Sequence, residues 1–418
     1  MSKKATLTCA AFLTLICTIP AMASDNTDEL TGHHLYINSN DKINKIIHYA
    51  QLRDGRLLEV SRIPTGGKGT GGYKPLTGQA FASDSLVSAG ALTVSPDHKW
   101  LFVVNAGDDT VSSFEIDKMG NLHLVDTQST ESAGDPSTLS FNAEKSMLYV
   151  GHTFGPDHIK IFSVKDGKLA LKPGFRSVNH GKAKDRILTQ VQISPDQKYL
   201  LANVLYDKRP ENLNGKVSLE PANTTTKDGL VVFPVDGNGG LGEPKFFDAG
   251  GSTPFGLTFI SGSDGKFVNT FDEAPGVAVL SRLNQDGSVT NLSRAQVKLS
   301  VPGVDNIGAC WVSMSPDGKT AFVAASDSGE VASFRINGDN LSFAKGGLGL
   351  LEKQDTSNDP SAKANGTPVG NWVSPNGYLY QLYPAAAKLI AYRINDDALE
   401  RVGSYAVPLN SAEGIGGF

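Results

Sequence analysis

Short apolar runs in which hydrophobic and polar residues alternate recur along the whole chain. In one such unit, GALTVS (90–95) is followed by the turn Pro96-Asp97-His98-Lys99 and by a second apolar run, WLFVVN (100–105). Two more alternating runs, TVSSFEI and LHLVDTQ, complete the unit before residue 130. A period of two is typical of a β-strand with one buried face, and Pro and Asp favour a tight turn. The unit therefore predicts four antiparallel strands, and no stretch of the chain shows a convincing helical period.

The same unit recurs seven times, which predicts a ring-shaped repeat fold. The apolar cores of the second strands can be aligned at spacings of 47 to 66 residues. The seven cores begin at Leu35, Leu101, Leu148, Leu200, Lys266, Ala321 and Leu379. A strand-rich repeat of about 50 residues is typical of the blades of a β-propeller. The sequence thus predicts an all-β, seven-bladed β-propeller with four antiparallel strands in each blade.

The two ends of the chain predict how the ring closes. The N-terminal copy begins directly at its second strand, HHLYINSN (33–40), without a preceding first strand. The C-terminal segment SAEGIGGF (411–418) has the pattern of that missing strand. Because an open ring would leave unpaired strand edges, we expect residues from about 408 to 418 to complete the blade that begins near residue 33.

Residues 1–23 have the order of a secretory signal peptide. Lys3 and Lys4 are followed by an apolar run from 5 to 19 and then by small residues up to Ala23. The apolar run is too short to span a bilayer comfortably. We expect cleavage after Ala23, a mature chain (24–418) that forms a single propeller domain, and a periplasmic or extracellular location.

Composition narrows the classes of partner. Cys9 and Cys17 lie in the predicted signal peptide, so the mature chain keeps Cys310 alone and forms no intrachain disulfide. Its stability must then come from a large core, which a chain of this length can bury. The formal net charge is −5, which argues against a nucleic-acid or an anionic-membrane partner. We expect a monomer without a membrane span.

The blade segments at 95–116, 251–259, 308–336 and 377–394 carry a further resemblance. They are similar to the seven-bladed propeller lactonases, the family that includes propeller-type 6-phosphogluconolactonase and fungal carboxymuconate cyclase. The resemblance implies a lactonase-type carboxylic ester hydrolase, or a lactone cyclase, that acts on a small lactone or carboxylate such as a sugar-acid lactone. It implies no cofactor, with a divalent metal as a lesser alternative.

One segment departs from the family pattern. The resemblance implies an Arg-His pair after Gly-Pro at the start of an inner strand, but the equivalent segment here, Ser252-Thr253-Pro254-Phe255-Gly256, has neither residue. The alternative function is therefore a non-catalytic propeller that binds a ligand or a protein and has lost the family active site.

Loops at one face of the ring carry the candidate site residues. If the innermost strand of each blade ends at the Ser-Pro-Asp turn, the loops after the second strands and the loops into the next blade share the opposite face. Lactone hydrolysis needs a base that activates water, donors for the developing oxyanion, and cations for an anionic substrate. We expect the catalytic residues to be His152, Arg186, Asp272 and Glu273, the substrate-binding residues to be Lys208, Arg209 and Glu413, and no residue to bind a metal.

Within this set, His152 and Arg186 form the pair most worth testing. They follow one another in adjacent predicted blades, so the ring can bring both to one sector of the channel mouth. A neutral imidazole suits a base, and a guanidinium suits an oxyanion or carboxylate anchor. The polar insertion at 207–227 is read in two ways, as a lid over the funnel or as a disordered loop.

Overall fold

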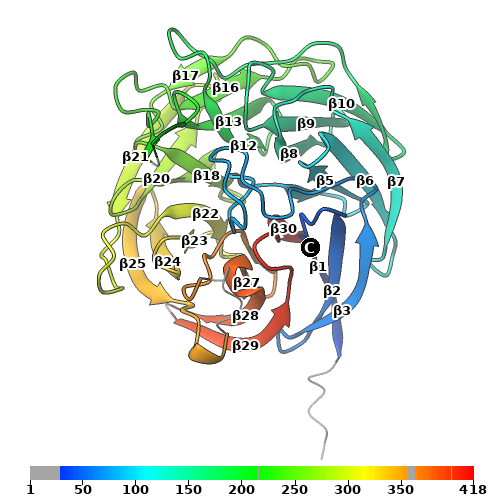
Figure 1. Cartoon of the computed structure of the whole chain (residues 1–418), viewed down its shortest axis with the longest axis vertical. Coiled ribbons are helices and arrows are strands. Elements are labelled where there is room, and N and C mark those ends of the chain that lie inside the picture. The colour runs from blue at the N-terminus through cyan, green and yellow to red at the C-terminus, as the bar shows by residue number, and fades with distance from the viewer. Residues whose placement is uncertain (1–28, 215, 356–362, 397) are drawn as a thin grey trace, which may run out of the picture.

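The described residues of the computed structural model, 29–214, 216–355, 363–396 and 398–418, form seven four-stranded antiparallel sheets arranged in a ring (Figure 1). From the innermost strand outwards, the sheets are β30(Ile415–Gly417)-β1(Leu30–Asn38)-β2(Lys45–Leu52)-β3(Leu57–Pro64); β4(Leu92–Val94)-β5(Trp100–Asn105)-β6(Thr110–Ile116)-β7(Leu122–Ser129); β8(Pro136–Asn142)-β9(Met147–His152)-β10(Ile159–Lys165)-β11(Lys168–Leu171); β12(Ile187–Ile193)-β13(Tyr199–Tyr206)-β16(Leu230–Pro234)-β17(Lys245–Phe247); β18(Pro254–Phe259)-β19(Lys266–Phe271)-β20(Val277–Leu283)-β21(Val289–Gln296); β22(Ala309–Met314)-β23(Thr320–Ala325)-β24(Glu330–Asn337)-β25(Asn340–Leu348); and β26(Asn371–Val373)-β27(Tyr378–Tyr383)-β28(Lys388–Asn395)-β29(Ala398–Ala406). The predicted seven-bladed β-propeller is confirmed.

Three short elements lie outside the blades. A two-stranded hairpin, β14(Glu211–Leu213) with β15(Lys216–Ser218), lies inside the insertion at 207–227. Two 3₁₀ turns, η1(Lys353–Asp355) and η2(Pro384–Ala386), follow β25 and β27. The insertion therefore contains regular structure in its described part, against the reading as a disordered loop. No helix in the described ranges has the length and the apolar character needed to cross a membrane.

The ring closes between the two ends of the chain, as the sequence predicts. β30 pairs antiparallel with β1, with Leu35 opposite Gly417 and Ile37 opposite Ile415. Beyond that strand, His34 and Phe418 exchange two backbone hydrogen bonds of 3.0 and 3.1 Å. The first blade thus contains one strand from the C-terminal end and three from the N-terminal end, and it has no unpaired inner edge.

Ser-Pro-Asp turns join the innermost strand to the second strand and define one face of the ring. Ser95 Oγ donates to Asp97 Oδ1 at 2.6 Å and accepts the backbone N–H of Trp100 at 2.9 Å. Ser194 binds Asp196 and Tyr199 in the same way. These bonds satisfy the polar groups of a tight turn, which explains why the tripeptide recurs. We call this side the turn face and the opposite side the loop face.

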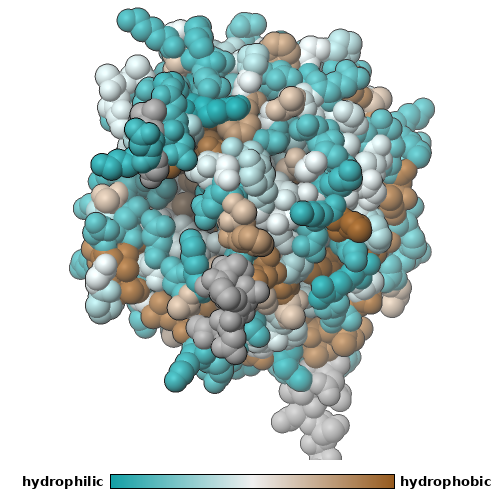
Figure 2. All heavy atoms as spheres, in the orientation of Figure 1, coloured by the Kyte–Doolittle hydropathy of each residue, from teal (hydrophilic) through white to brown (hydrophobic). Residues whose placement is uncertain are grey.

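A segment between the first two blades covers the central channel at the loop face. Residues 65–91, here called the strap, leave β3 and cross the centre of the ring before entering β4 (Figure 1). Figure 2, in the same orientation, shows atoms of the chain over the centre of this face. The strap begins with the glycine-rich stretch 65–72 and is an integral part of the channel.

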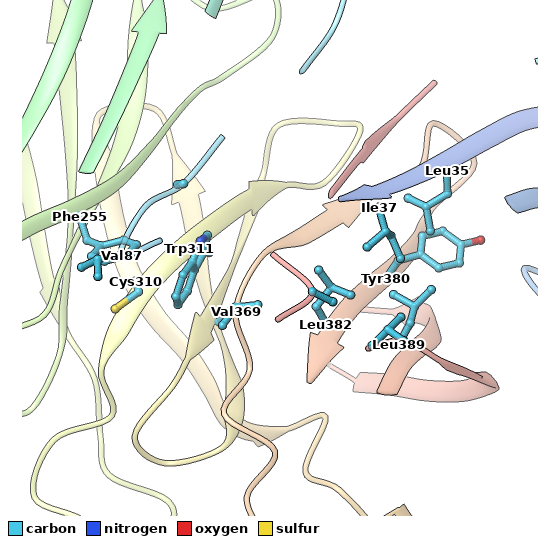
Figure 3. Close-up of a cluster of buried hydrophobic side chains, with 14 of the residues drawn as sticks. Leu35, Ile37, Val87, Phe255, Cys310, Trp311, Val369, Tyr380, Leu382 and Leu389 are labelled. Carbon is cyan, nitrogen blue, oxygen red and sulfur yellow. The ribbon is translucent and has the colours of Figure 1, made fainter. Parts of the chain in front are cut away.

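Hydrogen bonds and apolar packing hold the strap to several blades. Its backbone accepts the indole N–H of Trp311 at Ser88 O (2.8 Å), and its Ala89 N–H donates to Thr189 O at 3.0 Å. Val87 lies beside Phe255 and Trp311 in the buried cluster drawn in Figure 3. The strap therefore acts as a plug between the two ends of the channel.

Candidate functional site

Six polar side chains lie at the loop face near the axis of the ring. We call them the mouth cluster: Lys74 and Asp84 of the strap, Asp272 after β19, Asn306 before β22, Asp327 after β23, and Glu413 before β30. They come from three blades and from the strap, so only the folded ring brings them together. The cluster lies on the face that the sequence predicts, and it contains two of the predicted residues, Asp272 and Glu413.

Asp272 has the electrostatic properties of a general base. Its carboxylate is half-buried, and Asn306 Nδ2 donates to its Oδ1 at 3.3 Å and to Asp327 Oδ2 at 3.4 Å. Burial, and after it the negative charge of Asp327, raise the pKa of Asp272 to about 6. A carboxyl whose pKa lies near neutrality can be ionised at pH 7 and still bind a proton strongly. Asp272 is thus able to accept a proton from water.

Lys74 and Asp84 supply the charges of the strap side. Lys74 Nζ lies 3.0 Å from Asp84 Oδ2, and both side chains are about one-fifth exposed, at 18% and 21%. Although burial opposes protonation, the charge of Asp84 leaves the pKa of Lys74 raised. Lys74 therefore stays a cation, and its positive charge favours the ionised form of Asp272 and so works to lower the pKa of that carboxyl. The strap contributes to the site, although the sequence reasoning places no site residue on it.

Glu413 is the most deeply buried member of the cluster. It is 1% exposed, and its Oε2 accepts the N–H of Leu86 at 2.9 Å and the hydroxyl of Ser85 at 3.3 Å. Burial, and after it the charge of Asp84, raise the pKa of Glu413 well above its ordinary value. Its expected role as a substrate-binding loop residue is not compatible with this burial. Glu413 instead ties the C-terminal segment to the strap.

Arg186 is buried in an ion cluster rather than exposed on a loop. Its side chain is 0% exposed, and its Nη2 lies 2.7 Å from both Asp207 Oδ1 and Asp228 Oδ1. Its Nε donates to the same oxygen of Asp207, and its Nη1 donates to the carbonyls of Val178 and Asp228. All five N–H groups are thereby engaged. Arg186 has no free donor for a substrate, which corrects the predicted exposed position.

His152 is also buried. His158 is hydrogen-bonded both to His152 and to Arg186. The backbone carbonyl of His158 accepts the N–H of His152 at 2.7 Å, and His158 Nε2 lies 2.9 Å from Arg186 O. The His152 side chain is 0% exposed, and burial lowers its pKa to about 4. Its Nε2 finds no partner among the described residues. His158 therefore contacts both residues, and neither the His152 nor the Arg186 side chain reaches solvent.

The other three predicted residues bind partners outside the mouth cluster. Glu273 accepts the N–H and the hydroxyl of Ser252 at 2.6 and 2.8 Å and forms an ion pair with Arg294. Lys208 pairs with Glu211 beside the hairpin. The guanidinium of Arg209 lies 3.7 Å from the centre of the Phe154 ring. The structure therefore links Asp272 and Glu413 only through Lys74 and Asp84, whose charges act on both carboxyls.

Part of the chain matches a model of a known protein family. Residues 31–183 match the family model described as "Lactonase, 7-bladed beta-propeller". The match spans the described blade strands from β1 to β11, and it confirms the predicted resemblance to the propeller lactonases. No curated protein is similar enough in sequence to be matched.

Solved structures of the same fold cover almost the whole chain. The periplasmic gluconolactonase of Pseudomonas aeruginosa is 18% identical, with a TM-score of 0.63 over 92% of this chain and 98% of that chain. A Bacteroides fragilis protein, provisionally described as a 6-phosphogluconolactonase, gives the same four values. A Lactobacillus plantarum protein is 12% identical, with a TM-score of 0.66 over 92% and 99%. At these identities the likeness establishes the fold alone.

The mouth cluster adjoins the segment at which this lactonase-like propeller departs from the expected Arg-His pattern. The N–H of Asp272 donates to Thr253 O at 3.1 Å, immediately before the inner strand β18 begins at Pro254. Cys310 is the second residue of the neighbouring inner strand, β22, and is 4% exposed. Burial raises the pKa of its thiol well above the usual range. The thiol is therefore a packing group beneath the cluster. No trio of His, Cys, Asp or Glu in the described chain is arranged to hold a metal ion.

A second feature, a cavity in the turn-face half of the channel, is absent from the sequence reasoning. It has a volume of about 380 Å³. Its walls include Gln190 and Gln192 of β12, Ser313 of β22, and Asn371 and Trp372 of β26. The only sequence signal for it is the set of polar residues at inward positions of the inner strands, which alternate with core residues. The strap residues Ser88, Ala89 and Gly90 close its inner end.

Proposed function

We propose that the protein is an exported lactonase that hydrolyses a small, uncharged lactone at the mouth cluster. The observation that carries the proposal is Asp272, a half-buried carboxyl with a pKa of about 6 beside the start of β18. The match of residues 31–183 to the lactonase family supports the reaction class. The signal-peptide pattern of residues 1–23 supports export.

In the proposed reaction, the Asp272 carboxylate takes a proton from a water molecule as the water oxygen adds to the lactone carbonyl carbon. The ring C–O bond then breaks, and the departing alkoxide takes up the proton from Asp272, which gives the open hydroxy acid. Lys74 supplies positive charge for the carbonyl oxygen, and the Tyr206 hydroxyl supplies a hydrogen-bond donor. Both groups interact electrostatically with Asp272, so they act on the same substrate as the base. Burial, and after it the charge of Asp272, raise the pKa of Tyr206, so its hydroxyl keeps its proton.

The charges of the mouth favour a neutral substrate. Asp84, Asp272 and Asp327 interact with one another, and their negative charges outnumber the nearby cations Lys74 and Lys363. A phosphorylated sugar lactone would be repelled by these carboxylates. We therefore infer that the substrate is an unphosphorylated lactone, in contrast to the substrate named for the propeller-type 6-phosphogluconolactonases.

Lactone hydrolysis by the purified mature chain tests the proposal. We expect hydrolysis of D-glucono-1,5-lactone or another neutral lactone of a panel, and none above background for its 6-phosphorylated form. Asp272→Asn should lower kcat/KM by about 10²–10⁴-fold, as expected for loss of a general base. Asp264→Asn, the same substitution at an exposed residue on the turn face of the same blade, should keep full activity.

Two results would contradict the proposal. Full activity of Asp272→Asn would remove Asp272 as the base, and no hydrolysis of any lactone by the wild-type chain would remove the enzymatic function. The second result would favour the alternative, a propeller that binds a ligand without catalysis.

A further inference from the structure

The cavity in the turn-face half of the channel is separate from the mouth cluster. Val87 of the strap packs with Phe255 and Trp311 across the channel, and all three side chains are at most 4% exposed (Figure 3). On one side of this layer lies Cys310, which interacts with Asp272 and Asp84. On the other side lies the cavity of about 380 Å³, within the range of roughly 300–1,000 Å³ that is usual for small-molecule sites.

The walls of the cavity carry polar groups but no charge. Within the described residues its lining contains no Asp, Glu, Lys, Arg or His. The polar side chains are amides and hydroxyls: Ser88, Gln190, Gln192, Thr258, Ser313 and Asn371. A charged ligand would lose its hydration here without gaining an opposite charge. An uncharged ligand with several hydroxyl groups would replace its bonds to water by bonds to these amides and hydroxyls.

Two buried atoms of the lining lack hydrogen-bond partners. Ser313 Oγ and Asn371 Oδ1 are buried and find no partner among the described residues. The other end of the Asn371 amide is fixed, because its Nδ2 donates to Phe322 O at 3.2 Å. Buried polar atoms are almost always hydrogen-bonded, and both residues line the cavity, so a change of rotamer would let these two groups bind a polar ligand. A purely apolar ligand would leave both atoms unsatisfied.

Gln190, Trp311 and Trp372 are fixed in position before any ligand binds. Gln190 exchanges two hydrogen bonds with the backbone of Leu257, at 2.6 and 3.0 Å. The Trp311 indole N–H is bound to Ser88 O, and the Trp372 ring stacks on Tyr380 with centroids 5.9 Å apart. Two rigid indoles beside fixed amides can bind the C–H face and the hydroxyl edge of a sugar ring together.

We propose that the turn-face half of the channel is a binding site for an uncharged, hydroxyl-rich ligand of about the size of one sugar ring. The site is independent of the proposed catalysis, because it shares no side chain with the mouth cluster and is separated from it by the plug. Its natural ligand is a neutral sugar, sugar lactone or similar polyol, and anions are excluded by the lack of a cation in the walls.

Tryptophan fluorescence and calorimetry with defined probes test this site. The probes are D-glucose, D-galactose and D-xylose as neutral sugars, and sodium D-gluconate as the anionic counterpart. Two of the three tryptophans line the cavity, so we expect a saturable change in fluorescence with a Kd in the millimolar range for at least one neutral sugar, and none for gluconate. Asn371→Asp, which adds a negative charge to the wall, should weaken binding at least about tenfold.

Controls separate this site from the catalytic proposal and from a folding defect. Asp272→Asn should bind the sugar normally, and Trp100→Phe, which changes the tryptophan outside the cavity, should keep the fluorescence response. The rise of Tm with sugar concentration provides a second measurement for each variant whose unfolding is cooperative. Absence of saturable binding for all three sugars would leave water as the occupant and overturn the proposal. Equal binding of gluconate, or unchanged binding by Asn371→Asp, would also overturn it.

Discussion

Asp272 and Asp327 come from neighbouring blades and share one amide group, the Nδ2 of Asn306, at 3.3 and 3.4 Å. Because each carboxylate follows the second strand of its blade, the regular geometry of the ring brings the pair together at the channel mouth. Their mutual repulsion and the burial of Asp272 make this carboxyl more basic than an ordinary aspartate. This pair of carboxylates thus follows from the repeated geometry of the blades.

The rate of lactone hydrolysis should depend on the ionisation of Asp272. Its pKa of about 6 predicts a kcat/KM that is constant above neutral pH and falls roughly tenfold per unit as the pH decreases below about 6. Initial rates corrected for spontaneous hydrolysis check this profile. A midpoint near 4, the ordinary value for an aspartate, would show that another carboxyl acts as the base.

The same carboxyl should reduce stability at neutral pH. The folded-state pKa of Asp272 is raised above its unfolded value, so the folded chain binds the proton more tightly and loses stability as the pH rises from about 4 through 6. Asp272→Asn should therefore stabilise the protein by about 1–2 kcal/mol near neutral pH, and by nothing at about pH 4. Denaturant unfolding at the two pH values checks this. A loss of stability in the variant near neutral pH would contradict it.

Arg186 should contribute to stability rather than to substrate binding. Its removal leaves Asp207 and the buried Asp228 without their shared cation, so Arg186→Ala should lower the free energy of unfolding by about 3–5 kcal/mol. The exposed Arg209 provides a control, since loss of its contact with Phe154 should cost about 1 kcal/mol or less. Chemical denaturation of both variants provides the comparison. Equal effects would show that the ion cluster adds no stability.

Ring closure should depend on the absence of a side chain at position 417. A Cβ on Gly417 would lie 2.2 Å from His34 O and 3.1 Å from the ring of Trp372. Gly417→Ala should therefore destabilise the protein by about 1–3 kcal/mol. Gly237→Ala has nothing within 4 Å and should change stability by no more than about 0.5 kcal/mol. Thermal unfolding of the two alanine variants checks this difference. An equally small effect of both substitutions would show that the closing strand tolerates a side chain at position 417.

Export predicts a defined start of the mature chain. The small residues before Ser24 predict cleavage after Ala23, so the exported protein should begin Ser-Asp-Asn-Thr. N-terminal sequencing of protein from the periplasm or the medium checks this. Recovery of the chain from the cytoplasm with Met1 intact would contradict it.

The blades could be predicted from the sequence because their signals are local. Ser95, Pro96 and Asp97 mark a turn within three residues, and the alternating strands on either side of it can be read directly. The burial of Arg186 could not be predicted, because its partners Asp207 and Asp228 lie 21 and 42 residues along the chain. A charged residue next to a predicted loop is usually exposed, and only the folded structure reveals the ion cluster.

The strap was missed for a related reason. Glycine-rich segments are typical of flexible connectors, yet Gly69 is needed here because a Cβ would lie 2.2 Å from the backbone of Asn40. Its glycines permit a close approach between chain segments rather than free movement. The position of Asp272 after a second strand can be read locally, but Lys74 and Asp84 become its neighbours only when the strap folds across the channel.

The position of Glu413 makes the order of synthesis matter. The strand that completes the first blade, β30, is made long after the three strands that it joins, and Glu413, which fixes the strap through Leu86, lies two residues before it. A chain that is stopped early therefore lacks the closing strand, the anchor of the plug and the finished mouth at once. Proteases should degrade such incomplete chains as open rings, so that only chains with a complete mouth cluster persist.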